Sequence, residues 1–120
     1  MSNIIQEHEV DKWSKIITHE KLVHALKLIE SKDVYGFQSY CYDQLFVIGF
    51  DWGGWDEGRE FLKSGDLDFS DKDELFCYKL NTALLRNDRF CEGVLEYYIG
   101  NGVIAAIFGR LIELKKDAMI

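Results

Sequence analysis

The chain contains no proline among its 120 residues, although average usage would give roughly six. Because proline breaks helices and marks loops, its absence is typical of short helices joined by tight connections. Apolar residues make up 48% and charged residues 29% of the chain, which is the composition of a globular protein and not of a disordered one. The length predicts a single domain over residues 1–120.

Cysteine is also scarce, with three residues that lie far apart and form no C-x-x-C pair: Cys41, Cys77 and Cys91. The N-terminal residues lack the basic start, the apolar stretch and the small-residue cleavage site of a signal peptide. The apolar runs at residues 45–48 and 103–108 are too short to cross a bilayer. We therefore expect a cytoplasmic protein that has three reduced thiols and does not contact a membrane.

Basic residues are outnumbered, and the formal net charge is −7. Residues 51–74 hold nine acids against three bases, so this stretch alone carries −6. A stripe of basic residues that would follow phosphate groups is missing, and we expect no nucleic-acid partner. An acidic face either attracts a basic partner or keeps a small protein soluble.

Residue patterns that bind metals or catalyse reactions are missing as well. No third ligand stands at a usable spacing from the histidines, which are His8, His19 and His24. The run D-x-D-x-S from Asp66 opens like a calcium loop, but Asp71 replaces the required glycine and Cys77 the required glutamate. No phosphate-binding glycine loop and no nucleophile elbow occur. We expect no metal and no cofactor, and these absences favour a chain that is not an enzyme.

The spacing of apolar residues predicts helices over most of the chain. The predicted helical stretches are residues 10–17, 18–29, 51–64, 70–87, 91–99 and 103–116. Three residues are predicted to cap these helices at their N-termini: Thr18, Asp51 and Ser70. Gly65 is predicted to end the helix over residues 51–64. The predicted fold is all-α, a single compact bundle of five to seven short helices. Residues 37–50 suit a strand as well as a buried helix, so the alternative is an α+β fold with a strand pair near 37–50.

Two short motifs combine aromatic, acidic and glycine residues: FDWGGW at residues 50–55 and RNDRFCEG at residues 86–93. We expect the first motif to start a helix, with the Asp51 carboxylate accepting from the amide of Gly53 or Gly54. Polar groups that are buried beside aromatic rings need dedicated partners. The two motifs are therefore predicted to meet in space.

From about residue 42 to residue 114, the chain resembles a family of small bacterial domains that is known only as a domain of unknown function. Its members carry F-D-W-x-x-W, an acidic spacer and R-x-D-R-F-x-E-G between two apolar helices. The matching residues are Phe50, Asp51, Trp52, Trp55, Arg86, Asp88, Arg89, Phe90, Glu92 and Gly93. The chain departs from the family at Gly53, where members often carry proline. The resemblance implies a helix from Phe37 to Ile48, and hence an all-α fold, but it implies no activity.

Six motif residues form the candidate site: Asp51, Trp52, Trp55, Arg86, Arg89 and Glu92. One interpretation is a structural brace, in which arginine pairs with carboxylate between two turns. A second is a site for a small ring-shaped ligand against the tryptophans. A third is catalysis on a sugar or a phosphate by carboxylates and guanidinium groups. Mutual pairing of the charges would support the brace, and an open cleft would support the ligand site.

The brace predicts an ion pair between the two motifs, because aromatic neighbours exclude water from the charges. It would join one of two arginines to one of two carboxylates: Arg86 or Arg89 to Asp51 or Glu92. The rings predicted to surround this pair are Phe50, Trp52 and Phe90.

The functional prediction is a small cytosolic bacterial protein that acts as a non-enzymatic protein-interaction or accessory module. It follows from the small size, the missing cofactor and metal motifs, and the localised acidic charge. The alternative is a small-molecule binder or an enzyme whose site lies at the junction of the two motifs.

Overall fold

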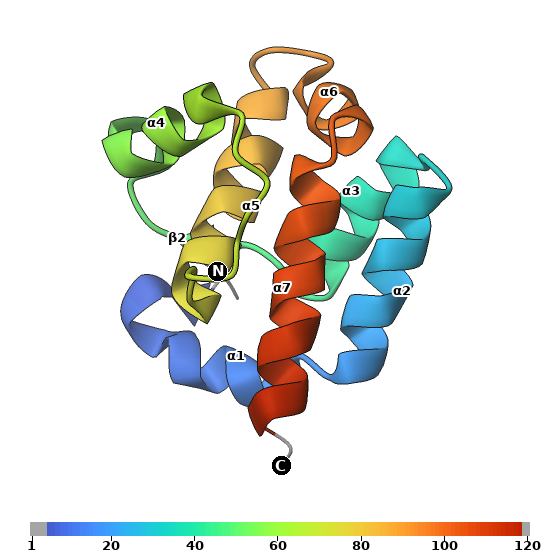
Figure 1. The fold of residues 1–120 in the computed structure, drawn as a ribbon, viewed down its shortest axis with the longest axis vertical. Coiled ribbons are helices and arrows are strands. Elements are labelled where there is room, and N and C mark those ends of the chain that lie inside the picture. The colour runs from blue at the N-terminus through green and yellow to red at the C-terminus, as the bar shows by residue number, and fades with distance from the viewer. Residues whose placement is uncertain (1–4, 119–120) are drawn as a thin grey trace.

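The computed structural model of the protein describes residues 5–118, and this part consists mainly of helices (Figure 1). The helices of this part are α1 Val10–Ile16, α2 His19–Glu30, α3 Val34–Asp43, α4 Asp56–Ser64, α5 Glu74–Asp88, α6 Val94–Gly100 and α7 Val103–Ala118. Two short 3-10 turns, η1 Glu7–Glu9 and η2 Trp52–Gly54, precede α1 and α4. The predicted all-α bundle is therefore confirmed.

Helix α7 runs through the middle of the bundle, between α2 on one side and α5 on the other (Figure 1). Its apolar residues recur at three- and four-residue spacing and face the core, with Val103, Ile104, Ile107, Phe108 and Leu111 buried. Helix α5 is buried around most of its surface, because η2, β2, α6 and α7 all contact it. Its buried residues include Cys77, Tyr78, Asn81, Thr82 and Leu85.

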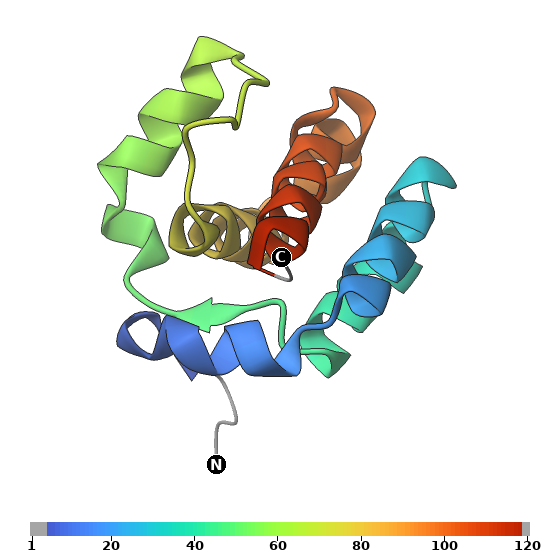
Figure 2. The same cartoon turned by 60° about the horizontal axis from the view of Figure 1, so that its bottom comes forward.

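Residues 37–50, for which both a strand and a helix were considered, contain the end of a helix and a short strand. Helix α3 ends at Asp43, and Leu45 then adopts a left-handed backbone with φ 64°. The strand β2, Ile48–Gly49, follows and pairs in parallel with β1, Ile5–Gln6. Figure 2 shows α1 running beneath β2. The helix implied as far as Ile48 is therefore wrong after Asp43, and a pairing two residues long is all that the described part of the chain keeps of the α+β alternative.

Side chains of α5 explain why the chain becomes extended here. The amide of Asn81 donates to the carbonyl of Phe46 at 2.9 Å, and the hydroxyl of Thr82 accepts from the N–H of Ile48 at 2.8 Å. Both side chains are fully buried. They give the backbone of this segment hydrogen bonds that a helix would otherwise have provided.

The predicted caps are confirmed at two helices and wrong at a third. Thr18 accepts from the N–H of Lys21 at 3.2 Å, and Gly65 ends α4 in the left-handed conformation. Helix α5 begins after Asp73, whose carboxylate accepts from the N–H of Phe76 at 2.8 Å. Ser70 lies upstream in the loop, where its N–H is bound by Asp68 instead.

The three cysteines are free thiols, as predicted. Cys41 and Cys77 are buried in the core, and Cys91 is exposed in the turn between α5 and α6. Among the residues that the structure describes, no helix has the length and apolar character needed to cross a membrane.

Candidate functional site

The FDWGGW motif builds a capped turn in front of α4. The carboxylate of Asp51 accepts from the N–H of Gly54 at 3.2 Å, which confirms the predicted hydrogen bond. The helix predicted from residue 51 is wrong in its start, because Asp51 caps only the 3-10 turn η2 and α4 begins at Asp56. A Cβ at Gly54 would lie 2.6 Å from one oxygen of the Asp51 carboxylate, so a larger residue there would force this side chain to shift. Asp51 is exposed, and its carboxylate is committed to the turn.

Trp55 is held rigidly between the motif and α5. Its ring makes edge contacts with Phe50 at 5.6 Å and with Phe76 at 5.3 Å between ring centroids. The ammonium group of Lys79 lies 4.8 Å from the Trp55 ring centroid, at cation–π distance. Gly58 of α4 is buried beneath the ring. Trp55 therefore forms a fixed wall at this end of α4.

The two motifs meet through their rings. Trp52 stacks on Phe90, with centroids 6.0 Å apart and planes inclined by 25°. The predicted meeting of the motifs is confirmed, but it occurs at the surface, because Phe90 is 81% exposed. Phe50 lies outside this stack and packs on Trp55.

The predicted ion pair between the motifs is wrong. Within residues 5–118, no ion pair joins either motif arginine to Asp51 or Glu92. The guanidinium of Arg86 lies 5.5 Å from the centroid of the Tyr42 ring, and Arg89 is exposed. The prediction assumed that the rings exclude water from the charges. Because Phe90 is itself exposed, the charges around it stay hydrated and need no partner.

Asp88 supplies the polar contact that holds the second motif in shape. Its carboxylate accepts from the N–H of Leu95 at 3.1 Å, across the turn that connects α5 to α6. Gly93 allows this turn by adopting a φ of 98°. Sequence reasoning did not select Asp88 as a site residue, because the contact spans seven residues and Gly93, not Asp88, is the N-cap of α6.

A pocket of about 260 Å³ lies beside the ring stack, and we name it the tryptophan slot. The rings of Trp52 and Trp55 line it together with buried Leu80 and Leu84 of α5. Its two polar residues other than the tryptophans are Arg59 of α4 and Asn87 of α5. Sequence reasoning missed Arg59, because its role depends on how α4 packs.

Arg59 already has partners within its own turn. Its guanidinium donates to the carbonyl of Gly53 at 2.5 Å and pairs with the carboxylate of Asp56. The Arg59 side chain is still 51% exposed, so it flanks the slot from the solvent side.

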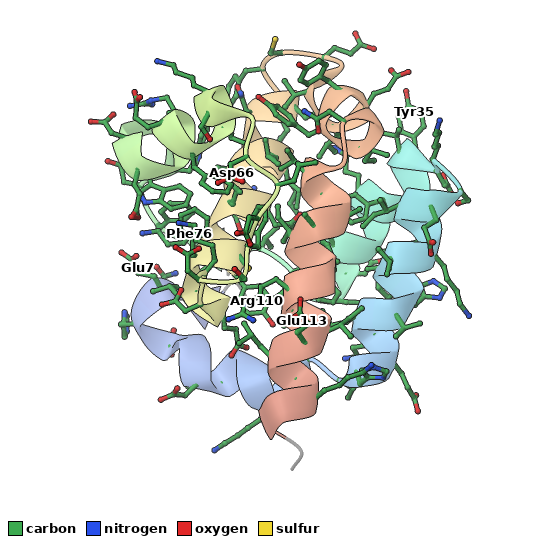
Figure 3. All side chains as sticks on the ribbon, viewed as in Figure 1. Glu7, Tyr35, Asp66, Phe76, Arg110 and Glu113 are labelled. Atoms are coloured by element: carbon green, nitrogen blue, oxygen red, sulfur yellow. The ribbon has the colours of Figure 1, made fainter. Side chains whose placement is uncertain are left out.

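A second pocket, of about 430 Å³, lies where the start of α3 faces α6, and we name it the acidic groove. Its carboxylates outnumber its one ammonium group, on Lys32, and belong to Asp33, Asp88, Glu92 and Glu96. Tyr35 also lines the groove and is 79% exposed. Figure 3 shows Tyr35 at the outer edge of the molecule, near the turn that joins α2 to α3.

The structure thus divides the six candidate residues. Trp52 and Trp55 line the tryptophan slot, and Glu92 lines the acidic groove. Asp51, Arg86 and Arg89 line neither pocket. Within residues 5–118, no group of three or more histidine, cysteine or acidic side chains could hold a metal ion.

Comparison with known proteins identifies a family but no characterised relative. A search of curated proteins and a search of solved structures found no match to the chain. The model of one protein family, described as a family of unknown function (DUF6508), matches residues 5–117. This match extends beyond residues 42–114, where the two motifs indicated the resemblance. The chain therefore belongs to the family of unknown function DUF6508.

Proposed function

We propose that this chain is a non-enzymatic module that binds another protein through the face where its two motifs meet. The exposed stack of Trp52 on Phe90 is the observation that supports this function. A large apolar ring left in water costs hydrophobic free energy, which binding to a partner would recover. Because Trp52 already orients the ring, little side-chain freedom remains to be lost on binding.

The tryptophan slot beside the stack supports a protein partner over a small molecule. The slot measures about 260 Å³, close to the lower end of the range of about 300–1,000 Å³ that small-molecule sites occupy. A space of this size suits one apolar side chain of a partner. Tryptophan and arginine, which both line the slot, are the residue types enriched at the energetic centres of protein interfaces.

The small-molecule alternative has one favourable observation, which is the concave apolar shape of the slot with Arg59 and Asn87 as its polar residues. Catalysis has less support, since the arginines and carboxylates of the two motifs do not converge on the slot. General acid–base chemistry requires such groups within hydrogen-bond reach of one substrate.

The test begins with affinity capture from the native host, using the full chain as bait. A captured protein is then purified, and its affinity is measured for wild type and for the variants Phe90→Ser and Trp52→Ala. We expect each variant to weaken binding by more than about tenfold, as truncation of a central interface residue does. Leu67→Ser is the matched control, because Leu67 is an exposed apolar residue outside both motifs.

Equal binding of the purified partner to wild type and to both motif variants would overturn the proposal. Circular dichroism of each variant is recorded beside the affinity, so that loss of the fold is not mistaken for loss of contact. A small molecule that binds wild type but not Trp52→Ala, with no protein captured, would favour the alternative.

A further inference from the structure

We propose that the partner presents an apolar side chain to the tryptophan slot and a lysine- or arginine-bearing segment to the acidic groove. This inference rests on the proposed function and adds the chemical nature of the partner. The occupant is one basic segment of a protein, not a free ion and not a nucleic acid.

The last turn of α5 connects the two pockets. Asn87 lines the tryptophan slot, and its neighbour Asp88 lines the acidic groove. The motif continues through Phe90, which stacks on Trp52, to Glu92, which lines the groove. A segment that lies across this turn therefore contacts the slot, the exposed Phe90 ring and the groove in succession.

The carboxylates in the acidic groove take part in no ion pair within the described residues. Asp33 and Asp88 are fixed, because each accepts a backbone N–H, from Gly36 at 2.9 Å and from Leu95 at 3.1 Å. Glu92 and Glu96 are exposed and take part in no ion pair within residues 5–118.

Four carboxylates against the ammonium group of Lys32 give the groove a formal charge of −3. Opposite charge on the partner would steer its approach, and like charge would oppose it.

Tyr35 adds a surface suited to cations. Its ring lines the groove and is 79% exposed, at the outer edge of the molecule (Figure 3). Ammonium and guanidinium groups are attracted to the face of an aromatic ring. The groove therefore combines carboxylates with an aromatic face, a pairing that matches lysine and arginine side chains and not acidic ones.

The test uses two synthetic peptides, both acetylated and amidated. The basic probe has one leucine followed by three lysines separated by single glycines, and the acidic probe has glutamates in place of the lysines. Each is titrated into isotope-labelled full-length protein, and amide chemical shifts are followed by NMR. We expect the basic probe to shift residues 33–38 and 92–96, and the acidic probe to leave them unchanged.

Two double variants that change the net charge by the same amount show where the basic probe binds. The double variant Glu92→Gln with Glu96→Gln should lower the affinity for the basic probe by at least fivefold. The control is Glu57→Gln with Glu60→Gln on α4, which removes two exposed carboxylates outside the groove and should leave the affinity within twofold. An equal loss in both variants, or no shift at residues 33–38 and 92–96, would overturn the inference.

The same titration separates this inference from the proposed function. If both probes shift the amide signal of Trp52 and neither shifts the signals of the groove, the apolar contact is supported and the inference of a basic segment is wrong. If the basic probe fills the groove while Phe90→Ser leaves a purified partner bound as tightly as before, the proposed function fails and the groove remains a site for basic segments.

Discussion

Asp88 and Arg89 are neighbours in the second motif, yet the structure gives them different roles. The Asp88 carboxylate binds the N–H of Leu95 across a turn, whereas the Arg89 side chain is exposed and forms no ion pair within residues 5–118. The brace was predicted for the arginine because its charge and bidentate geometry are conspicuous in a sequence. The structural contact instead belongs to the aspartate, which caps a backbone group.

This difference can be measured by substituting each residue with alanine. Asp88→Ala should lower the free energy of unfolding by about 0.5–1.5 kcal/mol, the usual net contribution of one intramolecular hydrogen bond. Arg89→Ala should change it by less than about 0.5 kcal/mol, as at an ordinary surface position. Urea denaturation monitored by circular dichroism measures both. A larger loss for Arg89→Ala than for Asp88→Ala would contradict the assignment.

At the scale of the element, the position of α4 depends on a glycine inside the helix. Gly58 is buried, and a Cβ at this position would lie 2.4 Å from two carbons of the Trp55 ring. Glycine in a helix interior normally costs about 0.8–1.0 kcal/mol relative to alanine. The close contact with the ring explains why glycine occurs here, because the missing side chain lets Trp55 pack against α4 and line the tryptophan slot.

Gly58→Ala should therefore destabilise the protein although alanine is the better helix former. We expect a lower midpoint of urea unfolding and a shift in tryptophan emission, because Trp55 must move. Gly100→Ala is the matched control, since nothing lies within 4 Å of a Cβ there. Unchanged emission and equal or higher stability in Gly58→Ala would show that Trp55 does not depend on this contact.

At the scale of the whole molecule, the fold buries two of the three thiols and leaves the third exposed to solvent. Burial raises the pKa of Cys77 to about 12 and raises that of Cys41 further. Thiolate is the reactive form, so near pH 8 both buried thiols stay protonated as well as shielded. Cys91 lies exposed in the turn between α5 and α6.

Titration of the native protein with a thiol reagent at pH 8 should therefore give one fast reaction, and unfolding in urea should release two more thiols. Cys91→Ser should remove the fast reaction and leave the two that appear on unfolding. Fast reaction of more than one thiol in the native protein would mean that the core opens readily.

Helix positions could be predicted across the molecule because the apolar spacing in α7 and the caps at Thr18 and Gly65 are local signals. The end of α3 could not, since it depends on Asn81 and Thr82, which are distant in sequence and look like ordinary helix residues. Trp52 and Trp55, which belong to one motif, both line the tryptophan slot. The acidic groove was missed, because it forms only where α3 and α6 come together.

The parallel pairing of β1 with β2 has a consequence for the order in which the chain folds. Ile5 pairs with Ile48, and helices α1, α2 and α3 lie between these two residues in the sequence. The pairing therefore cannot form until all three helices have been made. During synthesis, β1 leaves the ribosome before β2 and has no partner until β2 emerges. Thr82, which binds the N–H of Ile48, emerges later still. The strand β1 therefore reaches its paired conformation only after it is made, and it depends on segments that lie well after it in the sequence.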